Sequence, residues 1–222
     1  QSMLQEDFTP NRLEKAKEVL SEFIDKRTDD RLALIVFGGD AYTKVPLTFD
    51  HNVVKEMTGK LTVDDITSNT RTAIGMGIGV ALNRLKDSEA KSKVIILLTD
   101  GENNSGEMSP SAAADIAKEL GIKIYTIGIG AKEVKVPSFF GYTTVKNTEL
   151  DENMLKSIAE TTGGEYFRAS DSKEFKEIFN KIDALEKTQI DGRTFYDKHE
   201  LFENLLKLSL ILLVLGIFFE YV

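Results

Sequence analysis

Three residues with oxygen-bearing side chains, Ser2, Thr72 and Asp100, are placed where they could act together on a ligand. Ser2 precedes the first predicted helix, Thr72 opens a later one, and Asp100 follows a buried predicted strand. In an open α/β sheet, ligands bind beyond the carboxyl ends of the strands, so these side chains are expected to converge there. Two hydroxyls and a carboxylate are hard oxygen ligands, which suit Mg²⁺, with Mn²⁺ or Ca²⁺ as alternatives, and do not suit zinc or copper.

A metal ion held by these three side chains would keep a coordination position open. A carboxylate from a partner protein would fill it, so the metal would be a contact between proteins rather than a catalyst. Each residue also has a simpler interpretation. Asp100 taken alone is typical of a turn or helix-capping aspartate, and Ser2 and Thr72 taken alone are typical of capping residues.

The apolar pattern of the chain alternates between helix and strand. Residues 11–27 repeat apolar side chains at spacings of three and four, which is typical of an amphipathic helix. Residues 93–99 (KVIILLT) form a nearly unbroken apolar run, typical of a parallel strand at the centre of a sheet, and Pro46 places its own strand at an edge. The predicted helices are residues 11–27, 72–85, 111–120, 151–162 and 172–185, and the predicted strands are residues 31–37, 41–47, 93–99, 123–129 and 165–169.

This order of elements predicts an α/β fold, a Rossmann-like, doubly wound, mostly parallel sheet flanked by helices on both faces. One core over residues 1–185 is expected, since a single domain usually has about 100 to 200 residues. Residues 186–200 are a predicted polar linker. Residues 201–222, with a charge-free run at 208–219, are predicted to form a transmembrane helix, because a spanning helix needs about 20 largely apolar residues. The alternative for this segment is a core helix.

Composition excludes several classes of function. The net charge of −8 argues against nucleic acid as a partner, because phosphate binding depends on clustered Lys and Arg. The chain has no cysteine, which excludes disulfides, thiolate nucleophiles and thiolate metal sites.

Enzyme motifs are also absent from the sequence. LLTDG resembles the strand-end motif of haloacid dehalogenase hydrolases, but Leu98 stands where the nucleophilic aspartate is needed. No GxSxG elbow or GxxxxGK[ST] loop occurs, and only His51 and His199 could serve as an imidazole base. The glycines of residues 75–79 and 128–130 are interpreted as packing positions. We therefore predict that the protein is not an enzyme.

The loop predicted at residues 130–148 supports an alternative function. Its Phe139, Phe140 and Tyr142 could anchor a partner protein without any metal, since clustered aromatic residues often do so. They could equally fold back on the domain as a small core. A metal-independent assembly module therefore stays open beside the metal-dependent one.

Three stretches resemble the von Willebrand factor A domain family. KSKVIILLTDGENNSGE (residues 91–107) is similar to its central strand and metal loop, and RTAIGMGIGVALNRLKDS (residues 71–88) to its threonine loop and following helix. EDFTPNRLEKAKEVLSEFI (residues 6–24) resembles the segment after its DxSxS metal motif, and the resemblance extends to residue 185. It implies a metal-ion-dependent adhesion site with Ser2, Thr72 and Asp100 as ligands.

The chain departs from the family at its beginning. In the family the first strand ends in DxSxS, and Ser2 would be the last serine of that motif, whose aspartate and first serine are absent here. The preceding strand, a central one in this fold, is absent as well. We therefore expect a domain that lacks its first strand, a weakened metal site, and a sequence that is a fragment of a longer protein.

Residues 185–190 (LEKTQI) and the terminal apolar segment make the chain resemble the bacterial membrane-anchored BatA type of the Bacteroides aerotolerance group. This resemblance implies sibling von Willebrand factor A membrane proteins and a MoxR-type AAA+ ATPase as partners. The few positive charges around the predicted membrane helix favour the non-cytoplasmic side by the positive-inside rule. We expect a domain in the periplasm, anchored in the inner membrane.

Overall fold

The computed structural model describes residues 2–65, 71–101, 103–131, 133–138, 141–146 and 150–191, with side chains described at 2–65, 71–101, 103–131 and 150–186. The chain divides into two units, Gln1–Glu186 and Lys187–Val222. The elements that position the candidate site all belong to the first unit.

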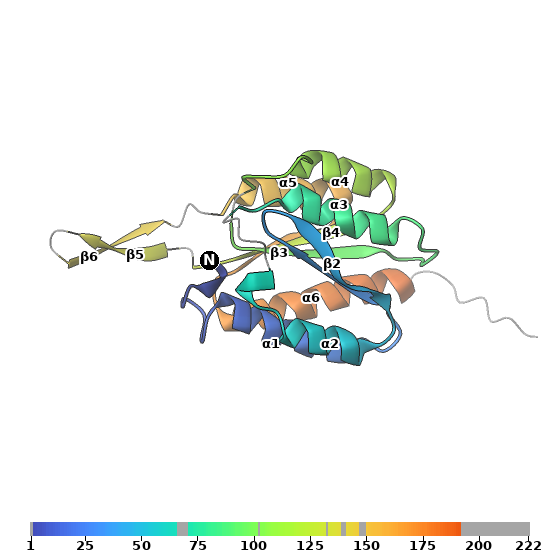
Figure 1. Cartoon of the computed structure of the whole chain (residues 1–222), viewed down its shortest axis with the longest axis horizontal. Coiled ribbons are helices and arrows are strands. Elements are labelled where there is room, and N and C mark those ends of the chain that lie inside the picture. Colours follow the sequence, from blue (N-terminus) through green and yellow to red (C-terminus); the bar gives the residue numbers. More distant parts are fainter. Residues whose placement is uncertain are drawn as a thin grey trace, which may run out of the picture. The chain divides into compact units, whose positions relative to one another are not determined.

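Three separate sets of paired strands belong to this unit, and two of them border the candidate site (Figure 1). β3 (Val94–Thr99), β4 (Lys123–Ile129) and β7 (Tyr166–Ala169) form a parallel sheet in the order β3-β4-β7. β1 (Leu32–Phe37) pairs antiparallel with β2 (Ala41–Thr48), and the register of this pair is irregular opposite Pro46. The predicted parallel sheet and the two predicted strands at residues 31–37 and 41–47 are confirmed.

Helices cover both faces of the parallel sheet, as the sequence predicts. Figure 1 shows α3, α4 and α5 on one side and α1, α2 and α6 on the other. β4 alternates between two apolar clusters, because Ile124 packs with the first group of helices and Ile127 packs with α1 and α6. The helices are α1 (Arg12–Asp25), α2 (His51–Gly59), α3 (Ile74–Leu85), α4 (Pro110–Glu119), α5 (Glu152–Thr162) and α6 (Ser172–Asp191), with 3₁₀ turns η1 (Ser2–Leu4) and η2 (Val63–Asp65).

Two elements differ from the sequence prediction. α2 was not predicted, and His51 opens this helix instead of lying in a turn. Its apolar face is short, since only Val54 and Thr58 are buried, and Val54 packs with Ile24 of α1 and Val45 of β2. Residues 130–148 were predicted as a loop, but they contain the antiparallel hairpin of β5 (Glu133–Ser138) and β6 (Gly141–Lys146).

The end of the chain is only partly described. α6 continues past the predicted end at residue 185 and reaches Asp191. The predicted transmembrane helix, residues 201–222, lies outside the described residues. Among the helices that are described, none is long and apolar enough to cross a membrane.

Close packing explains the glycines that could be mistaken for nucleotide-binding motifs. A β-carbon on Gly75 would lie 2.1 Å from the carbonyl oxygen of Met108, and one on Gly128 would lie 2.4 Å from Leu150 Cδ2. Neither position has room for a side chain, so α3 and β4 both need glycine there. The interpretation of these glycines as packing positions is confirmed.

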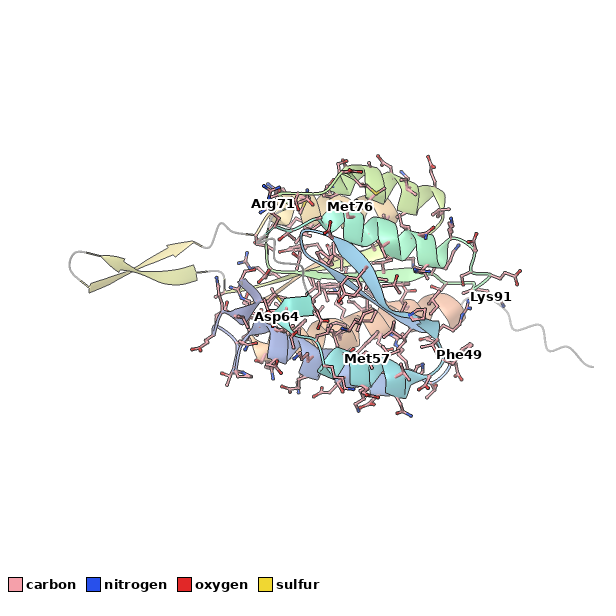
Figure 2. The ribbon with its side chains drawn as sticks, viewed as in Figure 1. Phe49, Met57, Asp64, Arg71, Met76 and Lys91 are labelled. Atoms are coloured by element: carbon pink, nitrogen blue, oxygen red, sulfur yellow. The ribbon has the colours of Figure 1, made fainter. Side chains whose placement is uncertain are left out.

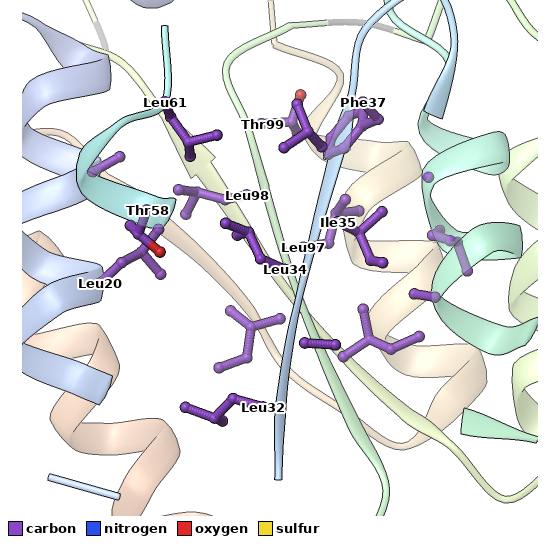
Figure 3. A pocket seen from close by; sticks show the side chains of 18 of the residues that line it. Leu20, Leu32, Leu34, Ile35, Phe37, Thr58, Leu61, Leu97, Leu98 and Thr99 are labelled. Atoms are coloured by element: carbon purple, nitrogen blue, oxygen red, sulfur yellow. The ribbon is translucent and has the colours of Figure 1, made fainter. Parts of the chain in front are cut away.

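β4, rather than β3, is the central strand of the described parallel sheet. β3 pairs with β4 along one edge, and its other edge faces a cavity of about 520 Å³ that also borders β1 (Figure 3). Leu34 and Ile35 of β1 lie across this cavity from Leu97 and Leu98 of β3. Apolarity predicted the burial of β3 between helices, but it does not specify which strand lies beside it.

Glu186 fastens α6 to the parallel sheet. Its carboxylate accepts hydrogen bonds from Tyr125 Oη (2.7 Å), Lys123 Nζ (3.1 Å) and Ser92 Oγ (3.0 Å). Burial alone would raise the pKa of Glu186, but these hydrogen bonds outweigh it and hold the pKa below the ordinary 4.5. The charged carboxylate is therefore the form that stabilises the fold.

We expect Glu186→Gln to lower the free energy of unfolding by about 1–3 kcal/mol at neutral pH, because the buried donors lose a charged acceptor. The matched control is Glu177→Gln on the same helix, where the ion pair with Lys173 is exposed, and it should change stability by less than about 0.5 kcal/mol. Since the pKa of Glu186 is lowered on folding, the difference between wild type and variant should shrink as the pH falls below 4.5. Urea unfolding at several pH values measures both effects, and equal losses in the two variants would contradict the assignment.

Candidate functional site

The structure brings the three predicted site residues to one edge of the sheet. Ser2 lies in η1, Thr72 lies two residues before the start of α3, and Asp100 directly follows β3. Ser2 Oγ donates a hydrogen bond to Asp100 Oδ1 at 2.9 Å. Thr72 Oγ1 lies 3.9 Å from where a β-carbon would stand on Gly101, and all three residues line the cavity between β1 and β3.

This edge is the carboxyl end of β1 and β3 alike. The amide of Ala73 donates to the carbonyl of Gly38, just after β1, at 2.6 Å. The carbonyl of Thr72 accepts from the amide of Asn104, after β3, at 3.0 Å. Figure 2 shows Arg71 at this edge and Lys91, which precedes β3, at the opposite one. The three loops are therefore joined by backbone hydrogen bonds before any ligand binds.

Two asparagines hold the threonine loop in place. Asn104 Oδ1 accepts from the amide of Thr72 at 2.8 Å, and Asn103 Oδ1 accepts from the amide of Ile74 at 2.8 Å. The N-cap residue of α3, Ala73, has no side chain able to cap the helix, so Asn103 does this from a distance. Sequence analysis did not identify either residue, although amide side chains in a turn beside a proposed ligand were a usable signal.

Arg12 is the other residue that sequence analysis missed. Its guanidinium is fully buried, and it donates through Nε and Nη2 to the two oxygens of Asp7 at 2.8 and 2.7 Å. Nη1 lies 3.4 Å from Asp100 Oδ2. Arg12 precedes the buried Ala16 by four residues and Val19 by seven. Because Arg12 lies in the apolar stripe of α1, its position in the sequence predicted a buried charge.

Burial and these contacts shape the charges at the site. Burial raises the pKa of Asp100, and the hydrogen bond from Ser2 and the charge of Arg12 offset that effect only in part. At Asp7 burial acts in the same direction, but the bonds from Arg12 outweigh it and the pKa is lowered. Although burial opposes its charge, the two carboxylates raise the pKa of Arg12. With Arg12 and Asp7 charged, ionised Asp100 leaves one net negative charge.

The side chains that could hold a metal are all hard oxygen donors. They comprise the hydroxyls of Ser2 and Thr72 and the carboxylate of Asp100, a set that fits Mg²⁺ or Mn²⁺. Within the described ranges, no group of three or more His, Cys, Asp or Glu side chains is placed to share a metal ion. A metal at this edge would therefore rely on the two hydroxyls beside a single carboxylate.

The residues of the alternative binding surface are not described in this detail. Phe139 and Phe140 lie outside the described residues, and Tyr142 belongs to β6, where side chains are not described. His51, the described one of the two candidate imidazole bases, donates through Nε2 to the carbonyl oxygen of Asp30 at 2.7 Å.

We expect Asn103→Ala to lower the free energy of unfolding by about 0.5–2 kcal/mol, because the first turn of α3 loses its capping oxygen. Asn83→Ala, an exposed change within the same helix, should be neutral or slightly stabilising, since alanine favours helices. Thermal unfolding of both variants checks this. An Asn103→Ala variant as stable as the Asn83→Ala control would show that the cap contributes nothing.

Comparison with known proteins agrees with this geometry. The model of the von Willebrand factor type A domain matches residues 1–181. An uncharacterised protein of Borreliella burgdorferi is 31% identical over 215 residues, which are 95% of this chain and 62% of that protein. The crystal structure of BatB from Bacteroides thetaiotaomicron is 32% identical, with a TM-score of 0.69 over 84% of this chain and 94% of that one.

A second solved structure is an aerotolerance-related membrane protein from Bacteroides fragilis, which is 31% identical with a TM-score of 0.66 over 81% of this chain and 92% of that one. The chain spans about three fifths of the length of the Borreliella relative. The resemblance found in the sequence, to von Willebrand factor A proteins of the aerotolerance group, is thereby confirmed. The chain belongs to the von Willebrand factor type A domain family.

Proposed function

We propose that this chain is a non-catalytic module that binds another protein through a divalent metal ion held by Ser2, Thr72 and Asp100. The observation that carries the proposal is the 2.9 Å hydrogen bond between Ser2 and Asp100, residues 98 positions apart, at the edge where Thr72 also lies. When bound, the ion supplies a positive centre with an open position for a carboxylate oxygen of the partner. Mg²⁺ is the ion that these oxygen donors suit best.

The preorganised loops support a binding role. Backbone bonds join Thr72 to Asn104 and Ala73 to Gly38, and they hold the segment that carries Thr72 beside the segment that follows Asp100. Asp100 is 8% exposed, so its carboxylate lies in a poorly solvated place where attraction to a cation is strong. The net negative charge of the site favours a cation over an anion.

The arrangement of the same side chains does not favour catalysis. A serine nucleophile needs a general base to take its proton, and the base most often used is histidine. Ser2 instead donates to a carboxylate that Arg12 contacts, and His51 bonds to the carbonyl of Asp30. These contacts support a role as a binding module rather than an enzyme.

Membrane anchoring and the identity of the partners belong to the same proposal. We infer that the domain lies on the periplasmic side of the bacterial inner membrane and assembles with sibling von Willebrand factor A proteins and a MoxR-type AAA+ ATPase. The similarity to a protein described as an aerotolerance-related membrane protein supports the membrane location. The apolar run at residues 208–219 is the segment that would provide the anchor.

The alternative function is assembly without metal through residues 130–148. The β5–β6 hairpin favours it, because the hairpin presents strand edges that a partner can extend by strand addition. Treatment with EDTA separates the two functions. A hairpin interface should be insensitive to the chelator, whereas a metal-dependent interface should be lost.

Mg²⁺ titration calorimetry on the whole chain in detergent tests the metal site. We expect saturable binding that Asp100→Ala abolishes, because that change removes the only carboxylate among the three ligands. Asp115→Ala, an exposed change on α4, is the matched control and should bind as the wild type does. Binding that survives Asp100→Ala, or no binding by the folded wild type, would leave the metal-independent module as the better account.

We also propose that the sheet accommodates one more strand between β1 and β3. β4 is buried at every position from Ile124 to Ile129, whereas the equally apolar β3 is buried only at Leu97 and Thr99. Among the described strands, only β4 pairs with β3, so no strand covers the second edge of β3. Because β1 and β3 run in the same direction, the added strand would pair with both in the same way, either parallel to both or antiparallel to both.

Hydrogen exchange tests this proposal by comparing the chain with a variant that carries an added strand-forming segment ahead of residue 1. We expect the amides of β1 and β3 to exchange at least about tenfold more slowly in the extended variant, because the added strand would bond to both edges. The amides of β4, already paired on both sides, provide the internal control. Equal exchange of β1 and β3 in the two proteins would rule out the additional strand.

A further inference from the structure

Three charged side chains form a chain of contacts at the candidate site. Arg12 lies between Asp7, with which it forms two hydrogen bonds of 2.7 and 2.8 Å, and Asp100, whose Oδ2 is 3.4 Å from Nη1. The exposed fraction of the side chain is 0% for Arg12, 19% for Asp7 and 9% for Asp100. Water therefore screens the charges of Arg12 and Asp100 poorly, whereas Asp7 is partly exposed to it.

The guanidinium of Arg12 is held in this position from several sides. Its backbone belongs to the first turn of α1, on the face that buries Ala16 and Val19. Asp7, in turn, accepts a hydrogen bond from the amide of Ala131 at 3.0 Å, so the arginine is tied to the segment that follows β4. A side chain fixed in this way cannot easily turn away into solvent when a second cation approaches Asp100.

The unequal contacts decide how much negative charge Asp100 offers to an ion. Asp7 takes two charge-assisted bonds from Arg12, whereas Asp100 receives a single longer one. Asp7 therefore neutralises most of the guanidinium charge. Without Asp7, the whole charge of Arg12 would act on Asp100 and repel a divalent cation.

We propose that Arg12 and Asp7 act together as positioning residues that set the affinity of the Asp100 site for divalent metal ions, with Arg12 as a resident cation and Asp7 as its counter-charge. The inference rests on the proposed metal-binding function and deepens it. Neither residue needs to touch the ion, because both act through the electrostatic potential at Asp100. The pair permits a buried carboxylate to exist in the metal-free protein while keeping its attraction for a cation.

Mg²⁺ titration calorimetry on whole-chain variants tests the proposal through the order of affinities. Arg12→Met removes the resident cation, so Mg²⁺ should bind at least about tenfold more tightly than in the wild type. Asp7→Asn leaves Arg12 uncompensated, so Mg²⁺ should bind at least about tenfold more weakly. The double variant Asp7→Asn/Arg12→Met keeps the net charge of the wild type, and its affinity should return to within a few-fold of it.

A purely structural role for these residues predicts a different order. If Arg12 only maintained the shape of the site, Arg12→Met would weaken Mg²⁺ binding, and the double variant would bind no better than either single variant. That result would overturn the inference. Arg12→Lys, which keeps the charge but loses the paired bonds, should restore an affinity close to that of the wild type.

Two controls keep the outcomes separate. Circular dichroism establishes whether each variant is folded. If Arg12→Met is unfolded, the Mg²⁺ affinities of Asp7→Asn, the double variant and Arg12→Lys still test the proposal. Asp100→Ala could abolish Mg²⁺ binding while the affinities of the Arg12 and Asp7 variants do not follow their charge. That result would overturn this inference and leave the proposed function in place. A folded wild type that binds no Mg²⁺ would overturn the proposed function and this inference with it.

Discussion

A carboxylate buried at the end of an apolar strand is the constraint on which this sheet edge depends. β3 delivers Asp100 to a position where only 8% of the residue is exposed, and a buried charge without partners costs several kcal/mol. Ser2 and Arg12 supply the missing partners, Ser2 from the segment that leads into α1 and Arg12 from the first turn of that helix. The placement of that segment beside β3 thus follows from the need to compensate one charge as well as from apolar packing.

Parallel strand direction then explains why the other loops collect at the same edge. Each strand that ends there leaves backbone groups unpaired, and buried groups of this kind need partners. The amide of Ala73 donates to the carbonyl of Gly38 and the amide of Asn104 donates to the carbonyl of Thr72, so backbone bonds link the three loops. Since most of these bonds involve the backbone, they constrain the path of the chain more than the identity of the side chains, which leaves Ser2, Thr72 and Asp100 available as ligands.

Sequence reasoning succeeded where one physical rule decided the outcome. Apolar runs located β3 and β4, helical spacing located α1, and the rule for strand ends brought Ser2 and Asp100 together. It failed where contacts with residues distant in sequence determine the structure. α2 is an example, because its stability depends on Val54 packing against α1 and β2. Arg12 was missed because it was counted as one of the charged residues of an amphipathic helix, although its position in the apolar stripe predicted burial.

The chemistry of the Ser2 hydroxyl connects the fold with the proposed function. Its hydrogen points to Asp100, so the lone pairs on its oxygen are available to a cation, and Asp100 keeps acceptor capacity beyond its bonds to Ser2 and Arg12. In a nucleophilic site the same hydrogen would face a base able to remove it at neutral pH. Burial raises the pKa of Asp100 in spite of Arg12, but a carboxylate is still a weaker base than the imidazole that most often activates a serine. An edge where a serine directs its hydrogen to a carboxylate, and keeps its lone pairs for a cation, is better suited to holding an ion than to transferring a proton.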